Sequence, residues 1–316
     1  MQTLAQIKAM LEAHGLSPRR HLGQNFLIDK NLVTKLADAA LEGIPSESGG
    51  PLVLEVGPGT GTLTEALLER GCRVVSIELD AGLAALLRAR APEHAAMGGQ
   101  LRLVEGDCLS RPGGRRESDA GGPDINAEAL AALNELGGPD GTFVLAANLP
   151  YGAGTPFLAA LLTRHHRRCR RVAVTVQLEL ADRLLARPRS RDYGPLSVLT
   201  QSLMDGRRLA ELPPECFWPR PDVRSAMVVL SAREHPLTDD PARLGAFCRR
   251  LFTSRRKQLG AILGRDTLWP PGVAPASRPE EVEVENLIAL MRASEGEERS
   301  NSESARGRPG KARLDS

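Results

Sequence analysis

This chain of 316 residues has few aromatic residues and few cysteines. Aromatic residues make up only 3%, so each one is worth locating. The five cysteines are odd in number and form no C-x-x-C pair, which argues against a disulfide framework or a zinc knuckle and favours a reducing compartment. No apolar run approaches the roughly 20 residues of a membrane span, and the first residues lack the apolar core of a secretory signal. We therefore expect a cytoplasmic protein that contacts no membrane.

The small net charge of +2 hides a difference between the two halves of the chain. Residues 1–160 carry 13 Lys and Arg against 19 Asp and Glu, and residues 161–316 carry 28 against 20. This favours a polyanionic partner contacted mainly by the second half, although an arginine-rich coding bias would produce the same pattern. The densest basic run, Arg164–Arg171, is either a nucleic-acid contact or a solvated helix end. Its adjacent histidines diverge, so we expect no metal site there.

Apolar strands that alternate with amphipathic helices predict an α/β fold with a Rossmann-like parallel sheet covered on both faces. The hydrophobic fraction of 41% is that of a globular protein. Helices are expected over Thr3–His14, from Asp29 to Ala40, and over Thr62–Arg70, Ala81–Arg90, Ala127–Leu136 and Thr155–His165. The expected strands are Leu52–Val56, Arg73–Ile77, Leu101–Val104, Phe143–Ala147 and Val172–Gln177, with Arg207–Leu212 and Ala226–Leu230 completing the sheet.

The pattern changes after Ala232, where only helices are expected, over Ala242–Phe252, Arg255–Leu263 and Val284–Ala293. The sequence therefore predicts a catalytic domain over 1–232 and a small helical domain over 233–294. Residues 295–316 contain almost no apolar side chain, which predicts a disordered tail. Residues 111–126 have the composition of a surface insertion.

A glycine-rich turn, Gly57-Pro58-Gly59-Thr60-Gly61, follows the first strand of the predicted sheet. Glycines let a backbone pass close to a ligand, and the next helix begins with free N–H groups. The spacing is G-x-G-x-G, not the G-x-G-x-x-G of dinucleotide sites, and Pro58 suits a pyrophosphate poorly. A turn with no ligand is the alternative interpretation.

Two acidic residues narrow the choice of ligand. Glu78 follows the second strand, where a carboxylate can accept both ribose hydroxyls. Asp107 follows the third, where a carboxylate can accept from an adenine amino group. Together with the glycine turn they predict a site for an adenosine without phosphates. S-adenosylmethionine fits this site better than NAD does, and Glu78 alone would also be consistent with a solvated strand end.

The tetrapeptide Asn148-Leu149-Pro150-Tyr151 follows the fourth strand at the same edge of the sheet. An exocyclic adenine amine is a poor nucleophile because its lone pair is delocalised into the ring. The side-chain oxygen of Asn148 and the carbonyl of Leu149 or Pro150 can accept its two N–H groups while Tyr151 stacks on the base. This is catalysis by positioning and electrostatics. A simple Asn-Pro turn with a core tyrosine is the alternative.

These motifs together resemble the bacterial ribosomal RNA small-subunit adenine N6,N6-dimethyltransferase family, also called dimethyladenosine transferases. The resemblance covers about residues 15–293 and departs from the family at Gly152-Ala153-Gly154, where larger residues are usual. The matching segments are His21–Asp29, the glycine turn, Ile77–Asp80, Gly106–Asp107, Asn148–Tyr151, Asp192–Val198, Pro213–Ser225, Phe252–Lys257 and Arg278–Glu281.

The resemblance implies dimethylation at N6 of two adjacent adenines near the 3′ end of 16S rRNA in the small ribosomal subunit, a role in ribosome biogenesis, and a monomer. It implies that Asn148, Pro150, Tyr151 and Phe217 form the catalytic site, with Phe217 as a second aromatic wall opposite Tyr151. It further implies RNA contacts in the helical domain. The implied S-adenosylmethionine ligands are Asn25, Leu27, Gly57, Glu78, Asp107 and Asn148, and the implied RNA contacts are Arg255, Arg256 and Lys257.

Two other functions remain open at this point. A large-subunit rRNA adenine methyltransferase would use the same chemistry on a different RNA. A non-enzymatic ribosome-assembly factor would keep the fold without transferring methyl groups, although the intact Asn148, Tyr151, Glu78 and Asp107 argue against it.

Overall fold

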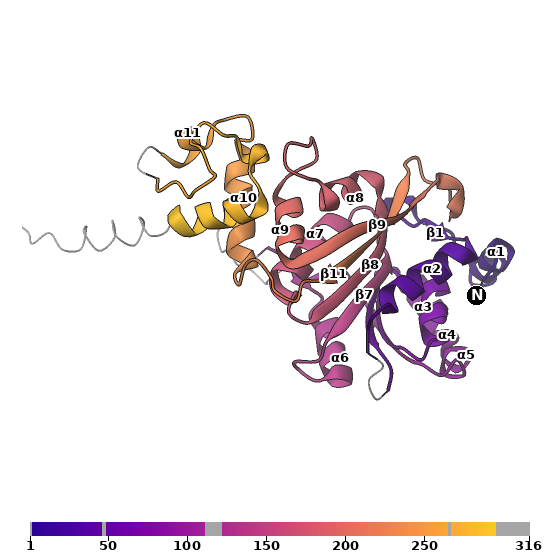
Figure 1. Cartoon of the computed structure of the whole chain (residues 1–316). Helices are drawn as coiled ribbons and strands as arrows, with labels where there is room; N and C mark the ends of the chain where they lie inside the picture. Colours follow the sequence, from indigo (N-terminus) through magenta and orange to yellow (C-terminus); the bar gives the residue numbers. More distant parts are fainter. Residues whose placement is uncertain (1, 46–48, 111–121, 265–266, 295–316) are drawn as a thin grey trace, which may run out of the picture.

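The computed structural model describes residues 2–45, 49–110, 122–264 and 267–294, and its centre is a seven-stranded sheet (Figure 1). The strand order is β4-β3-β2-β7-β8-β11-β9. Strands β4, β3, β2, β7 and β8 are parallel, and β11 runs antiparallel to both β8 and β9. The bounds are β2 (Leu52–Val56), β3 (Arg73–Glu78), β4 (Gln100–Glu105), β7 (Phe143–Asn148), β8 (Cys169–Gln177), β9 (Met204–Leu212) and β11 (Ser225–Ala232).

Two further pairs of short strands lie outside this sheet. Strand β1 (Phe26–Leu27) pairs with β10 (Phe217–Trp218), and β5 (Leu109–Ser110) pairs with β6 (Asp124–Ile125). The first pair joins segments almost 200 residues apart and was not predicted, because two-residue strands carry no periodicity of their own.

Helices cover both faces of the sheet (Figure 1). The helices are α1 (Leu4–Ala13), α2 (Lys30–Leu41), α3 (Thr62–Leu68), α4 (Ala81–Ala89), α5 (Ala91–Ala95), α6 (Ala127–Gly137), α7 (Gly154–Ala160), α8 (Leu178–Leu185), α9 (Pro195–Leu203), α10 (Pro241–Thr253), α11 (Leu259–Leu263) and a last helix over 284–294. Helices α5, α8 and α9 were not predicted. The others lie within a few residues of their expected bounds, except for α11.

Successive residues of the parallel strands enter two different hydrophobic clusters, as the alternation of side chains across a strand requires. Val53 and Val144 pack with α2 and α3 on one face. Leu54 and Leu145 pack with α6, α7, α8 and α9 on the other. The predicted three-layer α/β fold is therefore correct.

The helical region after β11 has a core of its own at the end of the molecule remote from α1 (Figure 1). That core also includes Ala186, Tyr193 and Val198, which precede the predicted boundary at residue 232. The hydroxyl of Tyr193 donates to the carbonyl oxygen of Val282 at 3.0 Å, so a buried hydrogen bond links the two parts. The division at 232 stays a prediction.

The helix expected from Arg255 begins only at Leu259. Residues 254–257 form turns instead, and Gln258 has an extended backbone with ψ 148°, which excludes an earlier helical start. Most of the predicted insertion, at 111–121, and the predicted tail over 295–316 lie outside the described residues. No helix among those described is long and apolar enough to cross a membrane.

Replacing Tyr193 by Phe removes the donor to the Val282 carbonyl without removing the ring from the core. The carbonyl is then left without its buried donor, so we expect the free energy of unfolding to fall by about 1–3 kcal/mol. Urea denaturation measures this. Tyr151→Phe is the matched control, since Tyr151 is only half-buried; an equal loss in both variants would contradict the proposed link.

Candidate active site

A cavity of about 570 Å³ opens at the carboxyl ends of β2, β3 and β7, where ligands bind in folds of this kind. A volume of this order suits a small organic ligand. Phe26, at the end of the 20–26 segment, forms part of its wall, together with the glycine turn and the chain after β4. Seven of the predicted site residues line it: Asn25, Gly57, Glu78, Asp107, Asn148, Pro150 and Tyr151.

The turn after β2 has a left-handed backbone at Gly57, Gly59 and Gly61, with φ of 67°, 61° and 89°. Side-chain-bearing residues rarely adopt this conformation. Space is short as well. A Cβ on Gly57 would lie 3.2 Å from Cγ of Pro150, and one on Gly59 would lie 2.8 Å from Cε1 of Phe26. The glycines therefore let the backbone pass between two walls of the cavity.

Glu78 is bound to this turn through backbone hydrogen bonds. The N–H of Gly59 donates to Oε2 at 3.1 Å and the N–H of Asp80 donates to Oε1 at 2.8 Å. Burial raises the pKa of Glu78 above its ordinary value, and these two N–H groups oppose the shift. Each carboxylate oxygen keeps a second lone pair, so Glu78 can still accept from a pair of ribose hydroxyls.

Asp107 is exposed on the far side of the cavity, after β4. Its Oδ1 accepts from the N–H of Leu109 at 3.0 Å, and its backbone carbonyl accepts from Nδ2 of Asn126 at 2.8 Å. These bonds fix the side chain and leave its other oxygen for a ligand. Two separated carboxylates and a glycine turn suit an adenosine that carries no phosphates.

Asn148 is oriented by the N-terminal segment. Its Nδ2 donates to the backbone carbonyl of Asn25 at 2.8 Å. The amide nitrogen is thereby used, and the side-chain oxygen is the end left for an incoming amine. The neighbouring Tyr151 is held by a 3.1 Å hydrogen bond between its hydroxyl and Oγ of Ser225, and burial raises its pKa, so the phenol is neutral.

Leu27 and Phe217 do not reach the cavity. They pair with one another across β1 and β10 and are buried in the cluster under α2, with exposed fractions of 6% and 3%. The other register pair, Phe26 and Trp218, faces the opposite way and stacks with centroids 6.3 Å apart. The aromatic wall in this structure is thus Phe26, which sequence reasoning missed although it lies in the His21–Asp29 motif. The roles of Leu27 and Phe217 stay predictions.

Known proteins are similar to this chain in sequence and in fold. The family model described as ribosomal RNA adenine dimethylase matches residues 15–295. The ribosomal RNA small subunit methyltransferase A of Rhodospirillum rubrum is 37% identical over 299 residues, covering 92% of each chain. That of Moorella thermoacetica is 35% identical over 298 residues, covering 90% of this chain and 95% of its own. The chain belongs to the ribosomal RNA adenine dimethylase family.

Two solved structures share the fold of this dimethylase. A dimethyladenosine transferase from Plasmodium falciparum superposes with a TM-score of 0.62 at 21% identity, over 84% of this chain and 95% of its own. The 23S rRNA methyltransferase ErmE superposes with a TM-score of 0.58 at 24% identity, over 86% and 100%. The predicted methyltransferase fold and family are confirmed, and the methyl donor of this enzyme is S-adenosylmethionine.

The arginine predicted to begin the RNA-contacting segment of the dimethylase binds protein groups instead. Nε of Arg255 pairs with the carboxylate of Glu280, Nη1 donates to the carbonyl of Arg191 at 2.6 Å, and Nη2 donates to that of Ser190 at 2.9 Å. Arg256 and Lys257 are exposed, and their side chains have no hydrogen bond or ion pair to the described residues. Arg255 therefore anchors the turn that presents them.

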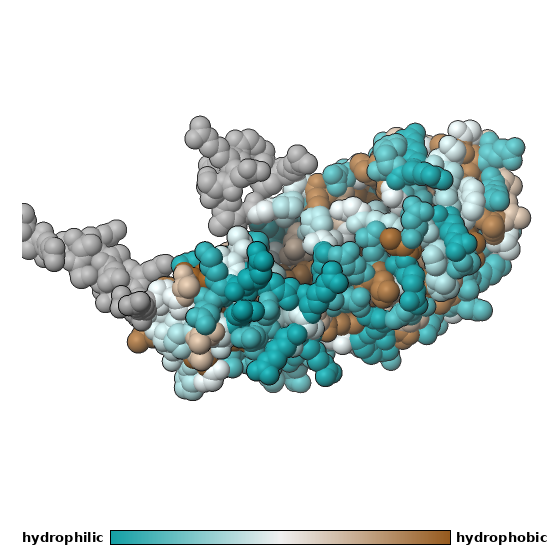
Figure 2. Space-filling view, turned by 90° about the horizontal axis from the view of Figure 1, so that it is seen from above, coloured by the Kyte–Doolittle hydropathy of each residue, from teal (hydrophilic) through white to brown (hydrophobic). Residues whose placement is uncertain are grey.

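The loop that Arg255 holds carries three more exposed arginines, Arg187, Arg189 and Arg191. Their R-x-R-x-R spacing was a signal that sequence reasoning overlooked. The loop is fixed to the helical region, because the N–H of Arg189 donates to the carbonyl of Glu280 at 2.7 Å. Hydrophilic residues cover much of the face shown in Figure 2, where the helical region adjoins the sheet.

The densest basic run, Arg164–Arg171, is largely used inside the protein. His165 pairs with Asp124 at 2.7 Å, Arg168 donates to the carbonyl of Gly141 at 2.8 Å, and Arg171 donates to that of Ala39. These contacts tie the end of the π-helical turn Leu161–His165 and the start of β8 to β6, to the loop before β7 and to α2. A dense run of charge therefore does not by itself identify an RNA surface.

One buried acid of the dimethylase lies beneath the cavity. Oε2 of Glu55, on β2, accepts from the hydroxyls of Thr64 at 2.7 Å and Ser76 at 2.6 Å, while Oε1 has no partner among the described residues. Burial raises the pKa of Glu55 from 4.5 to about 7, against the two hydroxyl hydrogen bonds. The folded protein thus favours the protonated carboxyl.

This shift predicts a pH dependence of stability. The contribution of Glu55 is complete below about pH 4.5 and is lost as the pH rises through about 7. A change of that size corresponds to about 3 kcal/mol. We expect the unfolding free energy of the wild type, minus that of Glu55→Gln, to fall by this amount between about pH 4 and pH 8. Parallel denaturation profiles for the two proteins would contradict the assignment.

Proposed function

We propose that this protein dimethylates N6 of two adjacent adenines near the 3′ end of 16S rRNA in the small ribosomal subunit and so takes part in ribosome biogenesis. The observation that carries the proposal is the orientation of Asn148. Its amide nitrogen donates to the carbonyl of Asn25, which leaves the side-chain oxygen as the acceptor, and Asn148 and Tyr151 both line the cavity.

S-adenosylmethionine, when bound, supplies an electrophilic methyl group on a sulfonium. Glu78 would accept the ribose hydroxyls and Asp107 the adenine amino group. The backbone at Gly57 would lie against the ligand without a side chain between them. Asn25, which lines the cavity, would contact the methionine end.

The target amine has two N–H groups and therefore needs two acceptors. Besides the side-chain oxygen of Asn148, the candidates are the backbone carbonyls of Leu149 and Pro150. The carbonyl of Pro150 already accepts from the N–H groups of Ala153 at 3.0 Å and Gly154 at 3.2 Å. The carbonyl of Leu149 is then the second acceptor, together with the side-chain oxygen of Asn148. These acceptors localise the lone pair on N6 while Tyr151 stacks on the base, so the acceleration comes from positioning and electrostatics.

Phosphate contacts are assigned to Arg256 and Lys257, with Arg187, Arg189 and Arg191 on the adjoining loop. For the oligomeric state and the compartment, we retain the expectations from the sequence, a monomer in the cytoplasm.

Undermethylated small subunits incubated with labelled S-adenosylmethionine should acquire label on the paired adenines, and Asn148→Ala should abolish most of it. One lost preorganised acceptor costs about 10²–10³ in rate. The amine's hydrogen bonds strengthen as nitrogen becomes tetrahedral, so RNA affinity should change far less than rate. Single-turnover methylation beside RNA titration separates the two.

Tyr151→Phe is the control, because it keeps the stacking ring and should keep most of the activity. Label on isolated large subunits instead would indicate the alternative RNA. An absence of transfer by the wild type would indicate an assembly factor. A near-wild-type single-turnover rate for Asn148→Ala would contradict the proposed mechanism.

Replacing Arg256 and Lys257 together by Ala should weaken RNA binding and flatten its salt dependence. Each lost phosphate contact removes about 0.9 units of slope on duplex-like RNA. S-adenosylmethionine affinity should not change. Arg164→Ala is the matched control, because its guanidinium donates to the carbonyl of Gly122 at 3.0 Å within the protein. If the control flattened the slope and the double variant did not, the RNA surface would lie at the basic run.

A further inference from the structure

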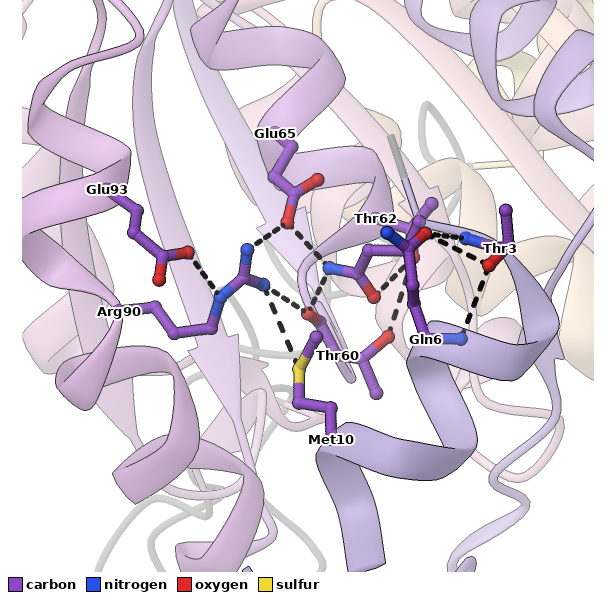
Figure 3. A network of polar contacts seen from close by, with 9 residues as sticks. Thr3, Gln6, Met10, Thr60, Thr62, Glu65, Arg90 and Glu93 are labelled. Carbon is purple, nitrogen blue, oxygen red and sulfur yellow. Dashed lines mark hydrogen bonds and ion pairs between the residues drawn. The ribbon is translucent and has the colours of Figure 1, made fainter. Parts of the chain in front are cut away.

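A polar network lies beside the glycine turn and is shown from close by in Figure 3; its residues do not line the cavity. Its centre is Arg90, just after α4. The guanidinium pairs with Glu65 at 2.7 Å and with Glu93 at 2.9 Å, and its Nη1 donates to the carbonyl of Thr60 at 3.3 Å. Thr60 belongs to the turn and Glu65 to the helix that follows it.

Gln2 reaches the same groups from the N-terminal side. Its Nε2 donates to the carbonyl of Thr60 at 2.8 Å and to Oε1 of Glu65 at 2.6 Å, and its Oε1 accepts from the hydroxyl of Thr62 at 3.2 Å. Gln2 is 5% exposed and Glu65 3%. One carbonyl of the turn therefore receives two side-chain donors from different parts of the chain.

The N-terminal helix secures this arrangement. Ile7 and Leu11 of α1 are buried against Leu86 and Leu87 of α4 and against Phe26, the aromatic wall of the cavity. Thr3 caps α1, with the N–H of Gln6 donating to its hydroxyl. Helix α1 thus packs beside the turn and delivers Gln2 to it.

The network is linked to the cofactor site through a single peptide segment. The carbonyl of Thr60 faces Gln2 and Arg90, while the N–H of Gly59 binds the carboxylate of Glu78 on the cavity side. Neither Gln2 nor Arg90 lines the cavity. Any shift of the turn would move the N–H that orients Glu78.

We propose that Gln2 and Arg90 are positioning residues for S-adenosylmethionine, acting through the Thr60 carbonyl to hold the glycine turn and Glu78 in the binding geometry. This inference rests on the proposed use of the cavity as the cofactor site. It assigns to α1 a part in cofactor affinity and no part in the transfer step.

The test compares Gln2→Ala and Arg90→Gln with Arg88→Gln. Arg88 lies in the last turn of α4, two residues before Arg90, but forms an exposed 2.7 Å ion pair with Glu105. S-adenosylmethionine binding is measured by calorimetry, and KM and kcat by methylation of undermethylated subunits. Each test variant should raise the dissociation constant and the KM for S-adenosylmethionine about three- to tenfold, as expected for lost hydrogen bonds. At saturating donor, kcat should stay within about twofold.

Arg90→Lys should recover part of the affinity, since it keeps the charge but loses the planar fork. Arg88→Gln should match the wild type. Wild-type affinity in folded Gln2→Ala would overturn the proposal, as would an equal loss in Arg88→Gln. Gln2→Ala removes no charge, so it decides the question if Arg90→Gln fails to fold. A wild type that binds S-adenosylmethionine but methylates no adenine would contradict the proposed function alone.

Discussion

The backbone between Val56 and Thr62 is the constraint on which the site depends. It leaves β2, turns through three glycines with positive φ and enters α3 within a few residues. Gly57 and Gly59 both have a positive φ that side-chain-bearing residues rarely adopt, and a Cβ at either position would crowd Pro150 or Phe26. The turn therefore determines how closely the walls of the cavity approach one another. It also places the Gly59 N–H where Glu78 accepts it, so the acid proposed to bind the ribose is positioned by the same turn.

Many arginine side chains in this protein bind other segments of the same chain through hydrogen bonds and ion pairs. Arg90 joins the glycine turn to α3 and α5, Arg171 joins β8 to α2, and Arg255 joins the loop before α9 to the helical region. A planar fork with five donors suits such sites, since one side chain can bind several backbone carbonyls at once. The charge difference between the two halves of the chain therefore overstates the basic surface open to RNA. Among the described residues, the basic side chains that are exposed and unpaired include Arg256, Lys257 and those of the neighbouring loop.

Most structural features that depend on local periodicity were predicted correctly from the sequence. Features that depend on contacts between residues far apart in the chain were not. The parallel strands were predicted because they are continuous apolar runs between breakers. The Asp29 cap was predicted because Asp is a preferred N-cap residue, and its carboxylate accepts from the N–H groups of Asn31 and Leu32. The cavity residues after β2, β3, β4 and β7 were found because carboxyl strand ends meet at one edge. Phe217 was predicted to line the base slot, but it does not reach the cavity in this structure, because its direction is set by pairing with Leu27, far away in the sequence. The start of α11 failed for a related reason: turns over 254–257 and an extended Gln258 precede it.

Asn148 shows how the two ends of the site depend on one another. Its side chain belongs to β7, but its orientation is set by the carbonyl of Asn25, in the segment that also carries Phe26. That segment is held by β10 on one side and by α1 and α4 on the other. The proposed acceptor for the target amine and a wall of the cavity are thus supported by one piece of chain. The motif at the end of β7 predicts the role of Asn148, whereas the direction of its amide is set by a residue more than a hundred positions earlier. Under the proposed mechanism, the N-terminal segment therefore orients the acceptor without taking a direct part in the chemistry.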